Sequence, residues 1–160
     1  MEAVKFKIPV QKGMQSLEGI IRFTHLCKMI GKSTGLIHEK THGSTIRGFE
    51  LKFKQKDVDM INSALQEIGN RLLYSVISKE PSHDPRSYAV GETVVEQIRA
   101  LGKVVCMPYI YRDRMGKTIV WFKNRQNKNT TNHYNDEDIM TINMIVREIA
   151  CKLLSIELIL

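Results

Sequence analysis

Residues 135–160, "NDEDIMTINMIVREIACKLLSIELIL", have the strongest helical pattern in the chain. Asn135 can cap a helix, and the acidic residues that follow it favour the positive end of the helix dipole. Apolar residues then recur at spacings of three and four up to the last residue, which predicts one long helix that continues to that residue. This seam consists of Ile139, Ile142, Val146, Ile149, Leu153, Ile156 and Leu160.

The same stretch has a second apolar face. A helix that is apolar on two sides needs two surfaces to pack against, and the domain's own sheet supplies only one of them. We therefore expect the first seam to pair with another helix, either in a homodimer or in a different protein partner. The expected interface residues are Ile142, Val146, Ile149, Leu153 and Ile156, and the second face consists of Met140, Met144, Cys151, Leu154 and Leu158.

Three further helices are expected. Residues 57–78 have an apolar stripe at helical spacing. Gly69 lies inside this stripe and costs ~1 kcal/mol in helix propensity relative to alanine, so we expect it to mark a close packing contact. A second helix is expected over residues 14–30, stopped by Gly31, and a shorter one over residues 92–101.

Two antiparallel hairpins are expected between the helices. "GLIHEKT" (35–41) and "TIRGFELKF" (45–53) form the first, and "VVCMPYIY" (104–111) and "TIVWFK" (118–123) form the second. The second pair is rich in β-branched and aromatic residues, which are frequent in strands. Pro108 cannot donate to a strand ladder, so it predicts an edge strand or a bulge. The order of elements predicts an α+β fold, with an antiparallel sheet flanked by helices and a long C-terminal helix.

Composition predicts one domain in a reducing compartment. A chain of 160 residues with 42% apolar and 26% charged residues is typical of one globular unit, so residues 1–160 are expected to form a single domain. No apolar run reaches the ~20 residues of a membrane span, and residues 1–10 lack the layout of a secretory signal. Three cysteines stand far apart without a C-x-x-C pair, which favours a cytoplasmic location.

The second half of the chain resembles a GAF domain. The resemblance lies in "IRALGKVVCMPYIYRDRMGKTIVWFKNRQNK" (98–128), followed by "YNDEDIMTINMIVREIACKLLSIEL" (134–158). Upstream, "SHDPRSY" (82–88) is similar to a loop of such domains. The closest similarity is to the regulatory GAF domains of cyclic-nucleotide phosphodiesterases. In that family a motif lysine and aspartate tie loops together, and the resemblance implies the same structural role for Lys128 and Asp136.

The resemblance implies a non-catalytic sensory and interaction module. Such a module has a cavity beside its sheet for a small molecule, here a cyclic nucleotide or another nucleotide, whose binding shifts the pairing of helices. No other cofactor and no enzyme activity are expected. The residues expected at the cavity are Asp84, Arg86, Tyr88, Arg99 and Tyr109.

Two binding functions remain as alternatives. The chain is a structural subunit of a larger assembly if its cavity is filled and its apolar seams are covered by other proteins. It is a nucleic-acid-binding protein if the basic hairpin expected over residues 112–128 holds phosphates, and the net charge of +7 favours this. Aromatic residues that can stack on bases are interleaved with that basic segment. Its six cations are Arg112, Arg114, Lys117, Lys123, Arg125 and Lys128.

A third alternative is a zinc hydrolase, because "GLIHEKTHGS" (35–44) contains the pattern H-E-x-x-H. On a helix, His38 and His42 would lie one turn apart and share a zinc ion, and the glutamate between them would activate a metal-bound water. Two bracketing glycines favour a strand instead, and Lys40 would place a cation beside the metal. We therefore expect no metal here, although Glu67 is available as a third ligand.

Overall fold

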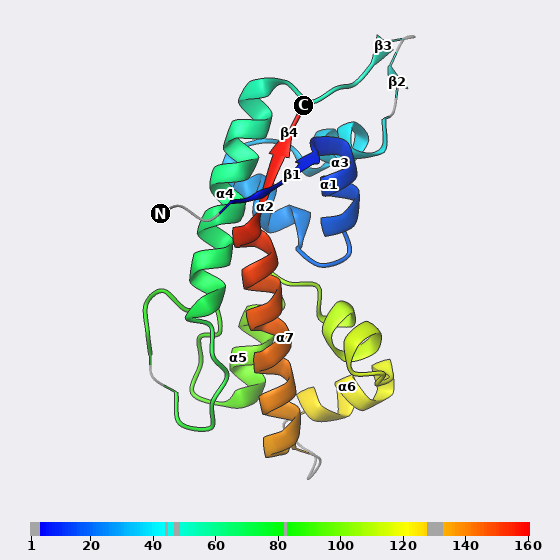
Figure 1. Ribbon diagram of the computed structural model, residues 1–160. Coiled ribbons are helices and arrows are strands. Elements are labelled where there is room, and N and C mark those ends of the chain that lie inside the picture. Colours follow the sequence, from blue (N-terminus) through cyan, green and yellow to red (C-terminus); the bar gives the residue numbers. More distant parts are fainter. Residues whose placement is uncertain (1–3, 44, 47–48, 82, 128–132) are drawn as a thin grey trace.

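The computed structural model of the chain describes residues 4–43, 45–46, 49–81, 83–127 and 133–160. These parts are mostly helical, and two long helices, α4 and α7, lie side by side through the middle of the molecule (Figure 1). The elements in order are β1 (Phe6–Pro9), α1 (Val10–Leu17), α2 (Phe23–Ile30), α3 (Thr34–His42), β2 (Thr45–Ile46), β3 (Phe49–Glu50), α4 (Gln55–Leu73), α5 (Val94–Leu101), the π-helix η1 (Tyr109–Arg114), α6 (Ile119–Gln126), α7 (Asp136–Ser155) and β4 (Ile156–Ile159).

The strands form two small pairs instead of the expected sheet. β1 lies parallel to β4, in a register that runs from Phe6 opposite Ile156 to Pro9 opposite Ile159. β2 and β3 pair antiparallel over only two residues each. The predicted α+β, GAF-like fold with an antiparallel sheet flanked by helices is therefore wrong for the described part of the chain.

The predicted hairpin over residues 104–111 and 118–123 is replaced by η1 and α6. Short apolar runs fit a buried helix as well as a strand, and here the helix forms. Pro108 stands directly before η1, where its φ of −58° suits a helix start and its missing N–H leaves no helical bond unmade. Ile110 and Tyr111 are buried, so the helix covers the core with the same apolar residues that a strand would have used.

The helix α7 begins where the sequence predicts and ends earlier. The Asn135 side chain accepts a hydrogen bond from the N–H of Asp138 at 2.8 Å, and the Asp138 carboxylate accepts one from the N–H of Asn135 at 3.2 Å. The helix ends at Ser155 rather than at the last residue, because Ile156 and Leu158 turn inward at strand spacing and pair with β1. Neither α7 nor any other helix within the described ranges is long and apolar enough to cross a membrane.

The seam that was expected to bind a partner lies in the core of this chain. α7 packs along α4, and each of the five residues expected at the partner interface is at most 9% exposed. Gly69 of α4 faces α7, and a Cβ there would lie 2.9 Å from Leu154 Cγ and 3.2 Å from the carbonyl oxygen of Ala150. The prediction of a close packing contact at Gly69 is confirmed. The seam no longer argues for a partner helix, and the five residues concerned are Ile142, Val146, Ile149, Leu153 and Ile156.

The helix expected over residues 14–30 is divided into α1 and α2. Between them the chain is extended at Ile21, which forms an isolated antiparallel bridge with Val105. The N–H of Arg22 donates to the carbonyl of Val104 at 2.9 Å. This bridge joins the start of α2 to the segment that follows α5.

Candidate nucleic-acid interface

A turn of three residues joins α2 to α3. α2 ends at Gly31, whose φ of 68° is left-handed, and the carbonyl of Cys27 accepts hydrogen bonds from the N–H groups of Gly31 and Lys32. Ser33 then caps α3, because its side chain accepts the N–H of Leu36 at 3.0 Å. Two short helices joined by a three-residue turn that contains glycine agree with a helix-turn-helix motif in their order and turn length.

Buried contacts fix one face of α3. Ile37 has no exposed surface, and the carbonyl of Thr41 accepts a hydrogen bond from the side chain of Gln15 in α1 at 2.9 Å. The ammonium group of Lys40 lies 2.9 Å from a carboxylate oxygen of Asp57 at the start of α4, and both side chains are nearly buried. These contacts set the position of α3 relative to α1 and α4.

One side of α3 is open to solvent. Thr34, His38 and His42 are exposed and follow one another at intervals of four residues, so they form one strip along the helix. Gly35 is exposed beside the start of this strip, and a Cβ there would meet only the Ser33 hydroxyl oxygen, at 4.0 Å. A helix that is fixed by buried contacts and carries an exposed strip can contact a groove of another molecule.

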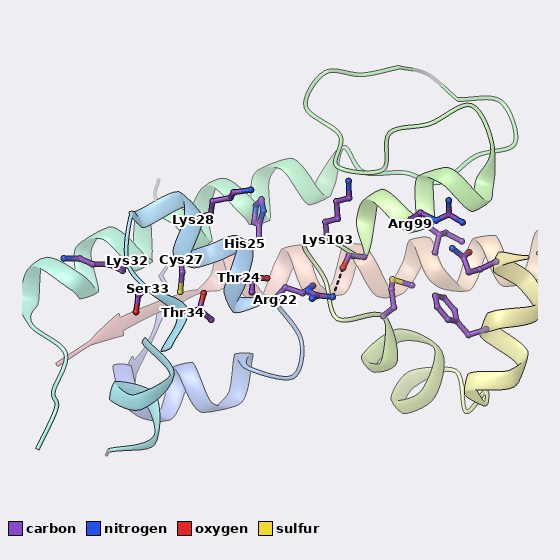
Figure 2. A pocket seen from close by; sticks show the side chains of 15 residues that line it. Arg22, Thr24, His25, Cys27, Lys28, Lys32, Ser33, Thr34, Arg99 and Lys103 are labelled. Atoms are coloured by element: carbon purple, nitrogen blue, oxygen red, sulfur yellow. Dashed lines mark hydrogen bonds between the residues drawn. The ribbon is translucent and has the colours of Figure 1, made fainter. Parts of the chain in front are cut away.

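A basic cleft of about 970 Å³ opens at the start of α3. One wall is formed by α2 and the turn after it, and the other by α5 and α6, as Figure 2 shows. Among the residues that the structure describes, those lining the cleft include five cations and no carboxylate. The cations are Arg22, Lys28, Lys32, Arg99 and Lys103, and we call this set the cleft cations.

Most of the cleft cations are available to a ligand. Arg22 donates to the carbonyl of Gly102 at 3.5 Å, a contact that crosses from one wall to the other (Figure 2). The remaining four form no ion pair with any acidic residue in the described ranges. Lys28, Arg99 and Lys103 are also exposed. Their uncompensated charge gives the cleft a positive potential that attracts phosphate groups.

Two titratable groups at the cleft do not reduce this positive charge. Burial, and then the positive charges of Arg71 and Lys28, lower the pKa of His25, so its imidazole is neutral near pH 7. Burial raises the pKa of the Cys27 thiol, although a hydrogen bond with Thr34 opposes the shift, so it is not a thiolate near pH 7. Neither side chain therefore supplies a negative charge to the cleft.

Comparisons with family models, curated proteins and solved structures found no match. The GAF resemblance therefore stays a prediction, and the antiparallel pairing in the described residues is limited to the short pair of β2 and β3 and the isolated bridge from Ile21 to Val105.

The five residues expected at a ligand cavity do not converge. Arg99 lines the basic cleft, whereas Asp84 lines a separate cavity of about 150 Å³. Asp84 and Arg86 bind each other at 2.8 Å, and the hydrogen bond from the Arg86 side chain lowers the pKa of Asp84 to about 2. Tyr88 is buried, and Tyr109 lies on η1. Of this set, only Arg99 belongs to the candidate interface.

The basic segment on which the nucleic-acid-binding alternative depends is not a hairpin. Arg112 forms an ion pair with Asp113, and Arg114 forms one with Glu148 of α7. These two cations are therefore already partnered within the chain. Lys128 lies outside the described residues. Of the other described cations in this segment, Lys117 and Arg125 lie over the Trp121 ring, whereas the cleft beside α3 is lined by five cations.

The H-E-x-x-H segment is helical, contrary to the prediction. Its second glycine, Gly43, is the C-cap of α3 with a φ of 70°, a regular way to end a helix rather than a sign of a strand turn. His38 and His42 lie one turn apart and both contact Glu18 at the end of α1. The third ligand considered from the sequence, Glu67, lines a different cavity on α4.

Sequence reasoning missed four of the five cleft cations. Lys103 is distant in sequence from Arg22, Lys28 and Lys32, and contacts such as the bridge between Ile21 and Val105 bring them together. The signal that was available is "GKS" (31–33), where a helix-stopping glycine is followed at once by a helix-capping serine.

Proposed function

We propose that the chain binds duplex DNA through α2, α3 and the basic cleft beside them. The observation that supports this most directly is the pair of helices α2 and α3, joined by a short turn, with α3 starting at the basic cleft. Among the described residues, the lining of this cleft includes five cations and no carboxylate. In helix-turn-helix motifs the second helix enters the major groove with its N-terminal residues toward the base edges, and the first helix crosses the phosphate backbone.

Each wall of the cleft has its own role in this proposal. Thr34 and His38, on the exposed strip of α3, lie where side chains would contact base edges. Lys28 on α2 and Lys32 in the turn lie where they would contact phosphates on one side of the groove. Lys103, after α5, would extend the phosphate contacts to the other wall, together with Arg99. The proposal gives the chain no catalytic step.

The number of cleft cations predicts the salt dependence of binding. Each phosphate that a protein neutralises releases condensed counterions, and log Kobs falls with log[salt] by about 0.9 per contact on duplex DNA. Five cations at one phosphate each give a slope of about −4.5. A small anion that occupies the same cleft would use one or two cations and give a much shallower slope.

Fluorescence anisotropy with a labelled duplex of mixed sequence, at several salt concentrations, tests the proposal. The double variant Lys28→Gln/Lys32→Gln removes two cleft cations, and we expect it to weaken binding and to make the slope shallower by about 2. Both lysines lie at the surface or close to it, so the substitutions leave the core intact.

The matched control is Lys56→Gln/Lys152→Gln. It changes the net charge by the same amount with two exposed lysines that do not line the cleft, one on α4 and one on α7. We expect this control to bind nearly as well as the parent chain. Equal losses in both double variants would show that only net charge matters, and binding without salt dependence would refute the proposal.

A further inference from the structure

Three side chains of metal-ligating types meet at the end of the exposed strip on α3. Glu18, at the C-terminal end of α1, lies 3.0 Å from Nδ1 of His38 and 2.8 Å from Nε2 of His42. The centroids of the two imidazole rings are 4.4 Å apart. One carboxylate and two imidazoles from two different helices therefore converge on one point.

This set of donors suits a divalent transition metal. Zinc is bound by histidine nitrogen and glutamate oxygen at about 2.1 Å, so its ligand atoms in a tetrahedral site lie roughly 3.4 Å apart. The three ligand atoms here are all within 4.8 Å of one another, so small side-chain rotations bring them to that spacing. We propose that Glu18, His38 and His42 bind one divalent metal ion of the zinc type.

The surroundings of the cluster remove the objection that the sequence raised. Lys40 stands between the two histidines in sequence, but its ammonium group is nearly buried 2.9 Å from Asp57, on the face of α3 that points into the protein. Lys40 therefore places no cation at the site. The side chains of Glu18, His38 and His42 are 32%, 57% and 43% exposed, so a metal ion can enter from solvent. Three protein ligands also leave a fourth position for water.

A bound metal would connect α1 and α3 on their solvent side. The two helices are already joined by the partly buried hydrogen bond from Gln15 to Thr41, and the metal would add a second link where the exposed strip ends. One consequence rests on the DNA-binding function proposed above: the occupied site would alter the part of α3 that faces the groove. Metal binding itself does not depend on that function.

Titration of the metal-stripped chain with zinc chloride, followed by calorimetry, tests the proposal without DNA. We expect one zinc ion per chain. We also expect the melting temperature to rise by about 5 to 10 °C when free zinc exceeds its Kd a hundredfold, because zinc then binds the folded chain selectively. Since no DNA is present, failure of this test leaves the DNA-binding proposal to its own experiment.

Two variants and one control make the assignment specific. Glu18→Gln and His42→Gln are each expected to lose stoichiometric zinc binding while keeping the parent circular dichroism spectrum, because both side chains lie at the surface. His83→Gln, an exposed histidine 3.5 Å from Glu92, is the matched control and is expected to keep zinc. All these chains retain the three cysteines. Zinc that stays bound in both ligand variants, or no zinc in the parent chain, would overturn the proposal.

Discussion

Replacing Lys40 with methionine is expected to destabilise the chain and to loosen α3. Lys40 and Asp57 form an ion pair at 2.9 Å between α3 and the start of α4, and their side chains are only 10% and 6% exposed. Methionine keeps most of the volume and apolar length of lysine but removes the charge. Asp57 is then left as a buried carboxylate with one remaining hydrogen bond, from the N–H of Lys54 at 3.0 Å.

The expected loss follows from that burial. Breaking a buried ion pair by removing one partner costs about 3 to 5 kcal/mol of stability. Because Asp57 keeps its hydrogen bond from the N–H of Lys54, we expect a loss at the lower end of this range, about 3 kcal/mol. For a chain of 160 residues, this corresponds to a fall in melting temperature of about 6 to 12 °C. The double variant Lys40→Met/Asp57→Asn leaves no buried charge at this site. The amide oxygen of the new asparagine can still accept the hydrogen bond from the N–H of Lys54. The double variant should recover at least half of the loss.

The difference between the parent and Lys40→Met should also shrink as the pH falls. Burial by itself raises the pKa of Asp57, but the backbone hydrogen bond from Lys54 and the charge of Lys40 lower it more, so its pKa lies below the ordinary value. This contribution to stability is complete above the unfolded pKa of about 3.9 and is lost as the pH falls through the folded pKa. Lys40→Met lacks the contribution from Lys40, so its free energy of unfolding falls less than that of the parent as the pH decreases.

Urea unfolding of the three chains at pH 7 and near pH 3, followed by circular dichroism, measures these differences. We expect a large deficit for Lys40→Met at pH 7, partial recovery in the double variant and a smaller deficit near pH 3. A single variant as stable as the parent would show that the ion pair does not hold α3. A double variant less stable than the single one would refute the argument from an unpaired buried charge.

Two further changes test how the core is assembled. Gly69→Ala should destabilise the chain by about 1 kcal/mol, because the clash with Leu154 and Ala150 outweighs a propensity gain of ~1 kcal/mol; a rise in the urea midpoint would contradict the close approach of α4 and α7. Asn62→Ala should cost about 1 to 3 kcal/mol, because the Asn62 amide donates to the carbonyl of Leu158 and accepts its N–H, both at 2.9 Å. An unchanged melting temperature would show that water satisfies these β4 groups equally well.

The long helices were predictable because their signals are local. The apolar stripe of residues 57–78 corresponds to α4 (Gln55–Leu73), and the capping asparagine before α7 was identified correctly. In both, the spacing of apolar residues persists over several turns, so one or two unusual positions do not change the prediction. The close packing contact at Gly69 was also predictable, because glycine lowers helix propensity and is therefore expected inside a strong helical pattern where another segment packs closely.

The short elements were not predictable from local pattern. α3 and α6 have only nine and eight residues, and isolated helices of that length are marginal, so their stability comes from contacts with distant segments. The ion pair from Lys40 to Asp57 is one such contact, and the pairing of β1 with β4 joins segments about 150 residues apart. The basic cleft depends on the same kind of contact, since Lys28 and Lys103 come from different helical units.

Lysine footprinting tests the central claim, that the helix-turn-helix and its basic cleft form the DNA-binding surface. The chain is treated with an amine-acetylating reagent, with and without saturating duplex DNA, and the modified lysines are quantified by mass spectrometry. The account predicts that DNA protects Lys28, Lys32 and Lys103 while Lys56 and Lys152 react at unchanged rates. Equal reactivity of the cleft lysines with and without DNA, or stronger protection of Lys56 and Lys152, would contradict it.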